Sequence, residues 1–362
     1  MNINLTKCLL FASLFSSSCL FAQAPAAEPA PEVKKDTPLS ISGQADAYFR
    51  SSSAKTAGLT SYAPGINSFG LGMANIVASK DLGNVSFTAD LMFGPRAEAT
   101  NYYYGTNSLS FIKQLFVTYK PSDKVKFTMG NFMTFVGYEL VEASNNLNYT
   151  MSYNYTNGPF FHTGLKGEFA LSDKLTLMAG VFEPTDNKFY NGDKGKLNVG
   201  GQLAYVNGGF KMYLNALTGK SHNPFTLNDK GVDTTTSGVT VLDLTTSYQV
   251  TPKFGLGLNI LKKSAKLSDV SSATKDAFTG FAVYLNYAVS DKFTLAGRGE
   301  YFNDEKGVAL FGTKITAFTL SGNFKIDALT IIPEIRIDSA KKEIFNGKKS
   351  DTDFILAAVY KF

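Results

Sequence analysis

The chain ends in the stretch SDTDFILAAVYKF, residues 350–362, which has the alternation of a β-strand. Successive side chains of a strand point to opposite faces. One face would carry Phe354, Leu356, Ala358, Tyr360 and Phe362, and the other Ile355, Ala357, Val359 and Lys361. Chain ends are usually frayed and polar. A strand that ends on an aromatic residue therefore predicts a partner strand that the chain end pairs with.

The same alternation recurs along the whole chain after the first forty residues. We count sixteen such runs, within a range of fourteen to eighteen, and each is about long enough to cross a bilayer as a tilted strand. The predicted strands lie near 39–50, 67–80, 84–93, 108–120, 125–136, 160–172, 174–184, 198–207, 209–219, 237–250, 252–263, 277–290, 292–302, 312–326, 328–339 and 351–362.

The connections between these runs alternate between short and long. Stretches such as KPSDKVKFTMG (120–130), ALSDKLTLMAG (170–180) and AVSDKFTLAGR (288–298) place a two- or three-residue polar turn between two alternating runs. Asp, Asn, Gly and Pro supply the backbone geometry of tight hairpins. Longer polar segments separate these hairpins, at 51–66, 94–107, 137–159, 185–197, 220–236, 264–276, 303–311 and 340–350. This pattern is typical of a barrel with short turns at one rim and long loops at the other.

Alternation alone does not separate a membrane barrel from a soluble β-sandwich, since both have one apolar face on each strand. Val85, Phe87 and Leu91, for example, oppose Ser86 and Thr88. Aromatic residues near strand ends favour the barrel, because they suit the two membrane interfaces. The residues expected there are Tyr48, Phe49, Phe93, Tyr119, Phe160, Phe161, Tyr205, Tyr248, Tyr287, Tyr301, Phe302, Tyr360 and Phe362. The predicted fold is an all-β, transmembrane, antiparallel barrel in which the last strand pairs with the first.

The N-terminus predicts export. Residues 1–24, MNINLTKCLLFASLFSSSCLFAQA, have a lysine, an apolar core and small residues after it, which is typical of a secretory signal. We predict a signal peptide over 1–22, a flexible Pro/Ala-rich periplasmic leader over 23–38 and the barrel over 39–362. Cleavage after Ala24, a buried N-terminal helix and a lipoprotein acylated at Cys19 are the alternatives.

Composition excludes several classes of function. Cys8 and Cys19 are the two cysteines of the chain, so the mature protein would have neither disulfides nor thiol metal sites. His162 and His222 are the two histidines, too few for most metal or acid–base centres. The net charge of +5 is spread along the chain with no basic cluster that would indicate nucleic acid. We therefore expect no metal, no cofactor and no catalytic residues.

The sequence resembles the beta-barrel porin family described as OmpL-like, from Gram-negative bacteria, over essentially 39–362. The resemblance rests on FIKQLFVTYKPSDKVKFTMGNFMTFVGYE (111–139), NNLNYTMSYNYTNGPFFHTGLKGEF (145–169), RGEYFNDEKGV (298–308), IIPEIRID (331–338) and LAAVYKF (356–362). It implies a pore in the cell outer membrane whose solute is unassigned. It also implies that Phe362 is the C-terminal signal that the barrel-assembly machinery reads.

A barrel of about sixteen strands is too wide for side chains to fill, so it would hold an aqueous channel. The longest loop, 137–159, is the candidate to fold inward and narrow it. Glu139 and Glu142 would bring acid to this constriction, and Asn146 and Asn148 would bring neutral hydrogen-bonding groups. The alternative is that this loop forms a lid on the surface.

Charged residues of the polar strand faces would line the lumen opposite this loop. By parity they are Asp46, Arg50, Asp90, Lys126, Lys166, Glu168, Lys211, Asp243, Arg298, Glu300, Glu334, Arg336 and Asp338, with His162 as a hydrogen-bonding wall residue. Opposed charges across a narrowing would create a transverse field that selects polar solutes. The alternative is that these charges are merely solvated in a wide lumen.

The predicted function is an outer-membrane porin through which small hydrophilic solutes or ions diffuse passively. Its partners would be outer-membrane lipid, the solutes, the barrel-assembly machinery and, by analogy with sixteen-stranded porins, two further copies in a homotrimer. The alternatives are a barrel that works as an adhesin or structural anchor through its loops, and an outer-membrane barrel hydrolase.

Overall fold

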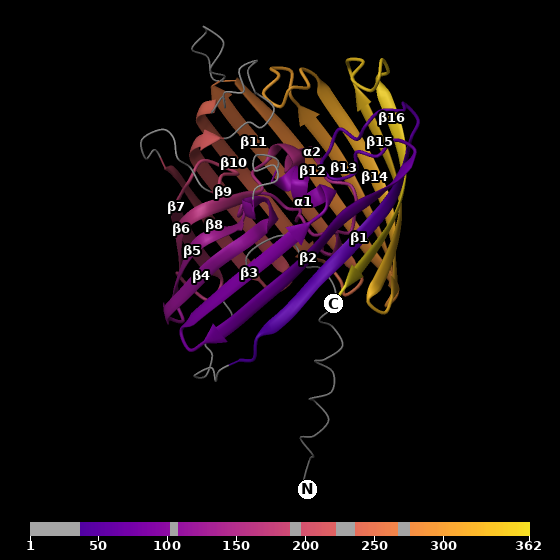
Figure 1. Cartoon of the computed structure of the whole chain (residues 1–362). Helices are drawn as coiled ribbons and strands as arrows, with labels where there is room; N and C mark the ends of the chain where they lie inside the picture. The colour runs from indigo at the N-terminus through magenta and orange to yellow at the C-terminus, as the bar shows by residue number, and fades with distance from the viewer. Residues whose placement is uncertain (1–36, 102–107, 189–196, 222–235, 267–275) are drawn as a thin grey trace.

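The computed structural model describes residues 37–101, 108–188, 197–221, 236–266 and 276–362. These form sixteen antiparallel strands in one closed barrel, which confirms the predicted fold class and strand number (Figure 1). The predicted signal peptide and nearly all of the predicted leader lie outside the described residues, as does His222. The strands are β1 Ser40–Ser52, β2 Ser68–Leu82, β3 Val85–Phe93, β4 Ile112–Ser122, β5 Val125–Met133, β6 Phe161–Ala170, β7 Leu175–Phe182, β8 Asn198–Asn207, β9 Phe210–Ser221, β10 Thr236–Gln249, β11 Phe254–Lys266, β12 Asp276–Ser290, β13 Phe293–Asn303, β14 Lys314–Ile326, β15 Leu329–Ala340 and β16 Ser350–Lys361.

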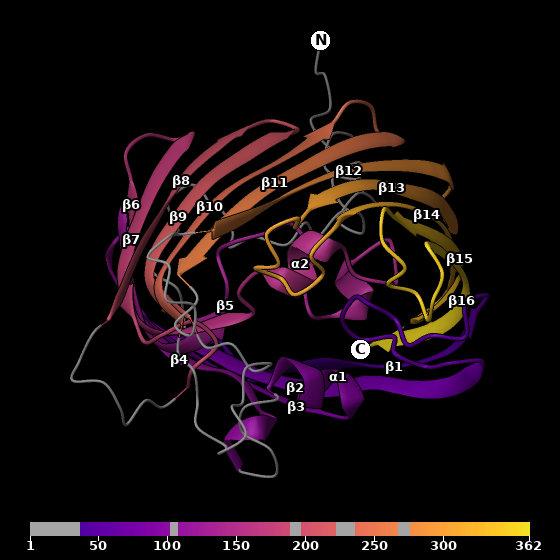
Figure 2. The ribbon, with the colours of Figure 1, turned by 90° about the horizontal axis from the view of Figure 1, so that it is seen from above.

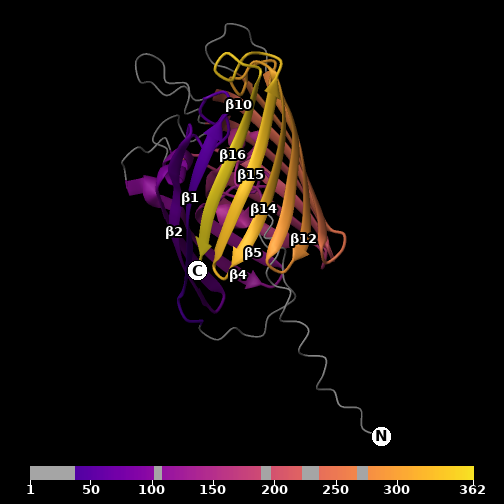
Figure 3. The same ribbon diagram turned by 90° about the vertical axis from the view of Figure 1, so that its right-hand side faces the viewer.

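The last strand closes the barrel against the first. β16 pairs with β1 in antiparallel register, from Gln44 opposite Lys361 to Ser52 opposite Asp353. Gly43 and Phe362 exchange both backbone hydrogen bonds, at 2.9 and 3.0 Å between nitrogen and oxygen. Figure 3 shows β16 lying beside β1 along its length. The predicted partner of the last strand is therefore β1, and the closed barrel leaves no strand edge unpaired.

Each strand presents an apolar face outward and a different face inward. On β16, Phe354 and Leu356 are exposed on the outside, whereas Ile355 and Val359 are buried on the inside. The prediction of the aromatic positions needs a correction. Tyr48, Phe161 and Phe302 are buried on the inner face, because strand parity rather than closeness to a strand end sets direction. Phe160, the last residue before β6, packs against Tyr155 of the loop.

The two rims of the barrel differ, as the alternation of connections predicts. Seven turns of two to four residues join the strands at one rim, which we call the short-turn rim, and the longer connections lie at the other, the long-loop rim (Figure 1). Gly83, Gly208 and Asp327 have positive φ angles of 58, 56 and 52° in two-residue turns. Such turns match the twist of the strands they join. No helix in the described parts of the chain is long and apolar enough to cross a membrane.

The connection between β5 and β6, residues 134–160, folds into the barrel rather than over its mouth. We call it the inner loop. It contains the 3-10 turn η4 Ala143–Asn145 and the helix α2 Tyr153–Asn157, and Figure 2 shows α2 within the ring of strands. The connection between β3 and β4 adds the helix α1 Pro95–Thr100 and the 3-10 turn η3 Ser108–Phe111. The buried apolar clusters therefore form inside the barrel, where loop side chains such as Phe135 and Tyr149 pack on inward-facing wall residues.

Candidate functional site

The inner loop stabilises its own shape through local hydrogen bonds. The Asn146 side chain donates to the carbonyls of Leu140 and Glu142, at 2.6 and 2.9 Å, and accepts from the Leu140 amide at 3.0 Å. Ser152 caps the N-terminus of α2, where its hydroxyl accepts from the Tyr155 amide at 3.1 Å. Asn146, predicted to bring a hydrogen-bonding group to a constriction, instead closes a turn of the loop.

Glu139 of the inner loop contacts the wall through Arg298 on β13. Arg298 Nη1 lies 2.6 Å from Glu139 Oε1, and Arg298 Nε lies 2.8 Å from Glu300 Oε1. Arg298 also donates to the Thr150 carbonyl at 2.6 Å, and Ser152 donates to Glu139. Burial raises the pKa of Glu139, and the Arg298 guanidinium opposes that rise.

Glu334 on β15 is an acceptor for the loop backbone. Its carboxylate receives the amides of Tyr149 and Thr150, at 2.6 and 3.0 Å, and the Ser321 hydroxyl at 2.6 Å. Asn148 of the inner loop joins the same group of hydrogen bonds, since its side-chain amide donates to the Ser321 hydroxyl at 2.7 Å. A buried carboxylate with several donors is well satisfied without a cation.

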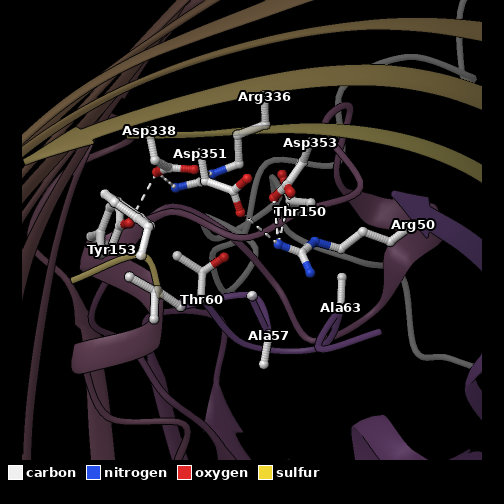
Figure 4. A pocket seen from close by; sticks show the side chains of 13 residues that line it. Arg50, Ala57, Thr60, Ala63, Thr150, Tyr153, Arg336, Asp338, Asp351 and Asp353 are labelled. Atoms are coloured by element: carbon white, nitrogen blue, oxygen red, sulfur yellow. Dashed lines mark hydrogen bonds and ion pairs between the residues drawn. The ribbon is translucent and has the colours of Figure 1, made fainter. Parts of the chain in front are cut away.

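Tyr153, the first residue of α2, connects to two strands of the wall, β13 and β15. Its amide donates to Glu300 on β13 at 2.7 Å, and its hydroxyl donates to Asp338 on β15 at 2.9 Å. Arg336 donates to Asp338 and to the Met151 carbonyl, at 2.7 and 2.8 Å, and Figure 4 shows Arg336, Asp338 and Tyr153 converging. Burial raises the pKa of the Tyr153 hydroxyl well above its usual value.

Two further groups attach the loops to β1. The Tyr149 hydroxyl donates to Asp46 at 2.7 Å, and Arg96 of α1 lies 3.6 Å from the same carboxylate. Nearer the long-loop rim, Arg50 donates to Asp353 at 2.9 Å (Figure 4). It also donates to the Gly65 carbonyl at 2.6 Å. These bonds join β1, β16 and the loop that follows β1 into one buried network.

Three inward-facing glycines of the wall receive side chains of the inner loop. A methyl group added to Gly280 would lie 1.6 Å from Asn154 Oδ1, and one added to Gly257 would lie 2.2 Å from the Tyr138 hydroxyl. At Gly200 the added group would lie 2.8 Å from the Phe135 ring. The missing side chains at these positions leave the space into which the loop packs.

The opposite wall, on β4 to β6, carries lysines. Lys166 Nζ lies 3.3 Å from Glu168, which Lys126 also contacts. The side chains of Lys126, Lys166 and Glu168 are 26, 11 and 13 % exposed, whereas Arg298 is fully buried. His162 is buried between Phe135 and Phe182, with Nε2 2.9 Å from the Thr134 hydroxyl. Among the described residues no group of three or more His, Cys, Asp or Glu side chains could hold a metal ion.

The structure places the predicted lumen residues on the inner face, and most of them fall into two groups. Asp46, Arg50, Arg298, Glu300, Glu334, Arg336 and Asp338 belong to the network that holds the inner loop, and Lys126, Lys166 and Glu168 lie on the wall opposite. The sequence predicted that the loop acids face wall charges across a gap, and this is wrong. Glu139 is bonded directly to Arg298, and Glu142 to Lys113.

Sequence reasoning missed Lys113 and Arg96. Lys113 contacts both Asp90 and Glu142, but a register shift between Asp90 and Leu91 disrupts the simple parity count there. Arg96 lies in a helix within a loop, where strand parity gives no direction. One sequence signal could have indicated them. The predicted inward face has more carboxylates than arginines, and buried carboxylates need cations nearby.

A family model described as "Putative beta-barrel porin-2, OmpL-like" matches residues 38–362. The chain belongs to this family. As a member, it is a porin of the outer membrane, and the predicted family and function are confirmed. A search of curated proteins found no match.

Solved porin-like barrels share the fold of this porin at low sequence identity. In vitro-folded OmpT of Vibrio cholerae, in its trimer form, is 14% identical with a TM-score of 0.59, over 90% of this chain and 99% of that chain. OmpF of Salmonella typhi, in complex with daunomycin, is 12% identical with a TM-score of 0.60, over 91% and 100%. OprB of Pseudomonas putida is 13% identical with a TM-score of 0.58, over 90% and 94%.

Proposed function

We propose that small hydrophilic solutes diffuse passively through this porin, along the side of the barrel formed by β4 to β9, where the inner loop makes fewer polar bonds to the wall. The observation that carries the proposal is the one-sided attachment of the loop. Its polar bonds go mainly to β13–β16 and β1, while the opposite wall keeps partly exposed lysines. Diffusion of this kind needs no energy source, no cofactor and no catalytic residue.

The inner loop would set the size limit of the passage. Because Glu334, Glu300 and Arg298 hold its backbone and side chains at several points, it would act as a fixed constriction rather than a mobile gate. The buried network on one side and the lysines on the other would orient polar solutes between them. The carboxylates of the network accept hydrogen bonds from the loop, which fits a structural role and a channel without enzymatic activity.

The remaining assignments follow from the barrel and its ends. The long-loop rim would face outward and the short-turn rim the periplasm, reached after removal of the signal peptide 1–22 and with 23–38 as leader. The exposed apolar outer face would contact outer-membrane lipid. Phe362, paired with Gly43 at the closing seam, would be the signal for the barrel-assembly machinery. We propose a homotrimer, since OmpT of Vibrio cholerae is described in a trimer form.

The test is single-channel recording of the refolded mature protein in a planar bilayer. We expect long-lived conductance steps, in groups of three if the protein is a trimer. A barrel that is folded, as judged by heat-modifiable migration on gels, and yet gives no steps would contradict the porin mechanism. The loops of the long-loop rim would then be the place to look for function, as in an adhesin or anchor.

A further inference from the structure

We propose that Lys120, Lys126 and Lys166 form a binding subsite for solutes that carry a carboxylate or phosphate group. This inference rests on the proposed passage of solutes along β4 to β9 and names the class of solute that the passage favours. It starts from the register of β5 and β6, which brings Lys126 and Lys166 together on the inner face, and from the closeness of Lys120 to Lys126.

The three lysines are neighbours in the wall. Thr118 on β4 pairs with Thr128 on β5, and the register shifts between Tyr119 and Ser122, where Lys120 lies close enough to Lys126 for their charges to interact. Thr128 pairs in turn with Lys166 on β6, and Lys126 pairs with Glu168. Since inward side chains alternate with outward ones, Lys126, Lys166 and Glu168 point into the barrel.

The charge of this group is not balanced. Glu168 contacts both Lys126 and Lys166, and it is the one carboxylate that the described residues place in ion-pair contact with either. Three lysines and one glutamate give a formal charge of +2. Like charges on a partly desolvated wall repel one another, and a bound anion would relieve that repulsion.

The group is also accessible and has neutral donors beside it. Lys126 and Lys166 keep 26 and 11 % of their side-chain surface exposed, in contrast to the fully buried Arg298. The hydroxyls of Thr118 and Thr128, 3.2 Å apart, lie next to the lysines on the same face. Ammonium and hydroxyl groups together suit the oxygens of a carboxylate or phosphate.

The other inward cations are less suited to this role. Arg298 and Arg336 donate to carboxylates and to carbonyls of the inner loop, so an anion would have to displace the loop to reach them. Lys166 makes a different kind of contact, since its ammonium lies 4.8 Å from the centre of the Phe132 ring. That contact positions the charge without neutralising it.

The experiment uses inorganic phosphate as probe against chloride current in planar bilayers. We expect phosphate to reduce the chloride current of the unchanged protein saturably. The double variant Lys126→Gln and Lys166→Gln should need about tenfold more phosphate for the same reduction. Lys292→Gln, in the exposed turn between β12 and β13, is the matched control and should behave like the unchanged protein. Glu168→Gln should shift the response toward less phosphate.

The outcomes separate this proposal from the porin mechanism itself. Normal conductance steps with no saturable effect of phosphate, or with the same effect in the double variant, would overturn the subsite and leave the pore intact. Steps missing from every folded variant would overturn the pore. A matching reduction by acetate supports the shared anionic chemistry, and an effect of phosphate alone narrows the solute to phosphates. Heat-modifiable migration of the single variant Lys166→Gln checks that the fold survives.

Discussion

Two walls of one barrel use inward-facing charges in opposite ways. On β13–β16 and β1, residues such as Arg298 and Glu334 are buried and bonded to the inner loop. On β5 and β6, Lys126 and Lys166 share one glutamate and remain partly exposed. A charge on the inner face of a porin therefore does not by itself line the passage. Whether a loop covers that charge decides between a structural role and a role toward solutes.

Removal of Arg298 should have the largest effect, because this residue bonds the inner loop to the wall. Arg298→Ala leaves Glu139 buried without its guanidinium partner, leaves Glu300 with Arg336 alone, and frees the Thr150 carbonyl. Loss of one partner of a buried ion pair costs about 3–5 kcal/mol. We expect urea unfolding at markedly lower concentration and larger, noisier conductance steps as the loop loosens. Steps of unchanged size and noise would show that Arg298 does not hold the loop in place.

A methyl group added to an inward-facing glycine of the wall should displace the inner loop without removing any charge. Gly280→Ala would bring the new carbon into Asn154, and overpacking of this kind costs about 1–3 kcal/mol. Gly299→Ala on neighbouring β13, where the added carbon would meet open space, is the matched control. We expect the unfolding midpoint and the conductance to change in the first variant and to stay constant in the second. Equal behaviour of the two variants would contradict the packing of Asn154 against Gly280.

A smaller effect is expected where a single hydrogen bond is removed. Tyr153→Phe keeps the ring that packs 5.6 Å from Phe302 but loses the hydroxyl that donates to Asp338. The cost should be about 1 kcal/mol, because Arg336 still donates to Asp338. Urea unfolding measures it, and Tyr248→Phe, on the exposed outer face, should have no comparable effect. A loss as large as that of Arg298→Ala would mean that Tyr153 has a wider role.

The last effect concerns pH. Asp186, in the connection after β7, accepts from the amides of Phe160 and Phe161 where the inner loop ends, and burial raises its pKa from 3.8 to about 6. A raised pKa means that the folded state binds the proton more tightly than the unfolded state. Stability from this group is therefore present below about pH 4 and is lost as the pH rises through about 6, at up to about 1.4 kcal/mol per pH unit. Asp186→Asn should flatten the pH dependence of unfolding between about pH 4 and 6, and an unchanged slope would contradict the assignment.

Much of the fold could be predicted because the signals are local. Period-two alternation and short Asp- or Gly-containing turns lie within about a dozen residues of one another, and they are enough for the strand number and the closing pair. Parity also predicts which charges face inward. It is insufficient for Lys113, because a bulge shifts the register. The prediction that Tyr48 and Phe302 lie at the membrane interfaces is wrong because it follows closeness to a strand end, whereas parity places both on the inner face.

A sixteen-strand barrel with two unlike rims and a charged inner face is already specified by the sequence, since the alternation of side chains along a strand depends on neighbouring residues only. The path of the inner loop, and which charges it covers, depend on the tertiary structure. Tyr149 and Glu334, or Glu139 and Arg298, are 185 and 159 residues apart in the chain, and barrel closure is what brings them together. The lysines of β5 and β6 remain open to the lumen because the loop is bonded to the other wall.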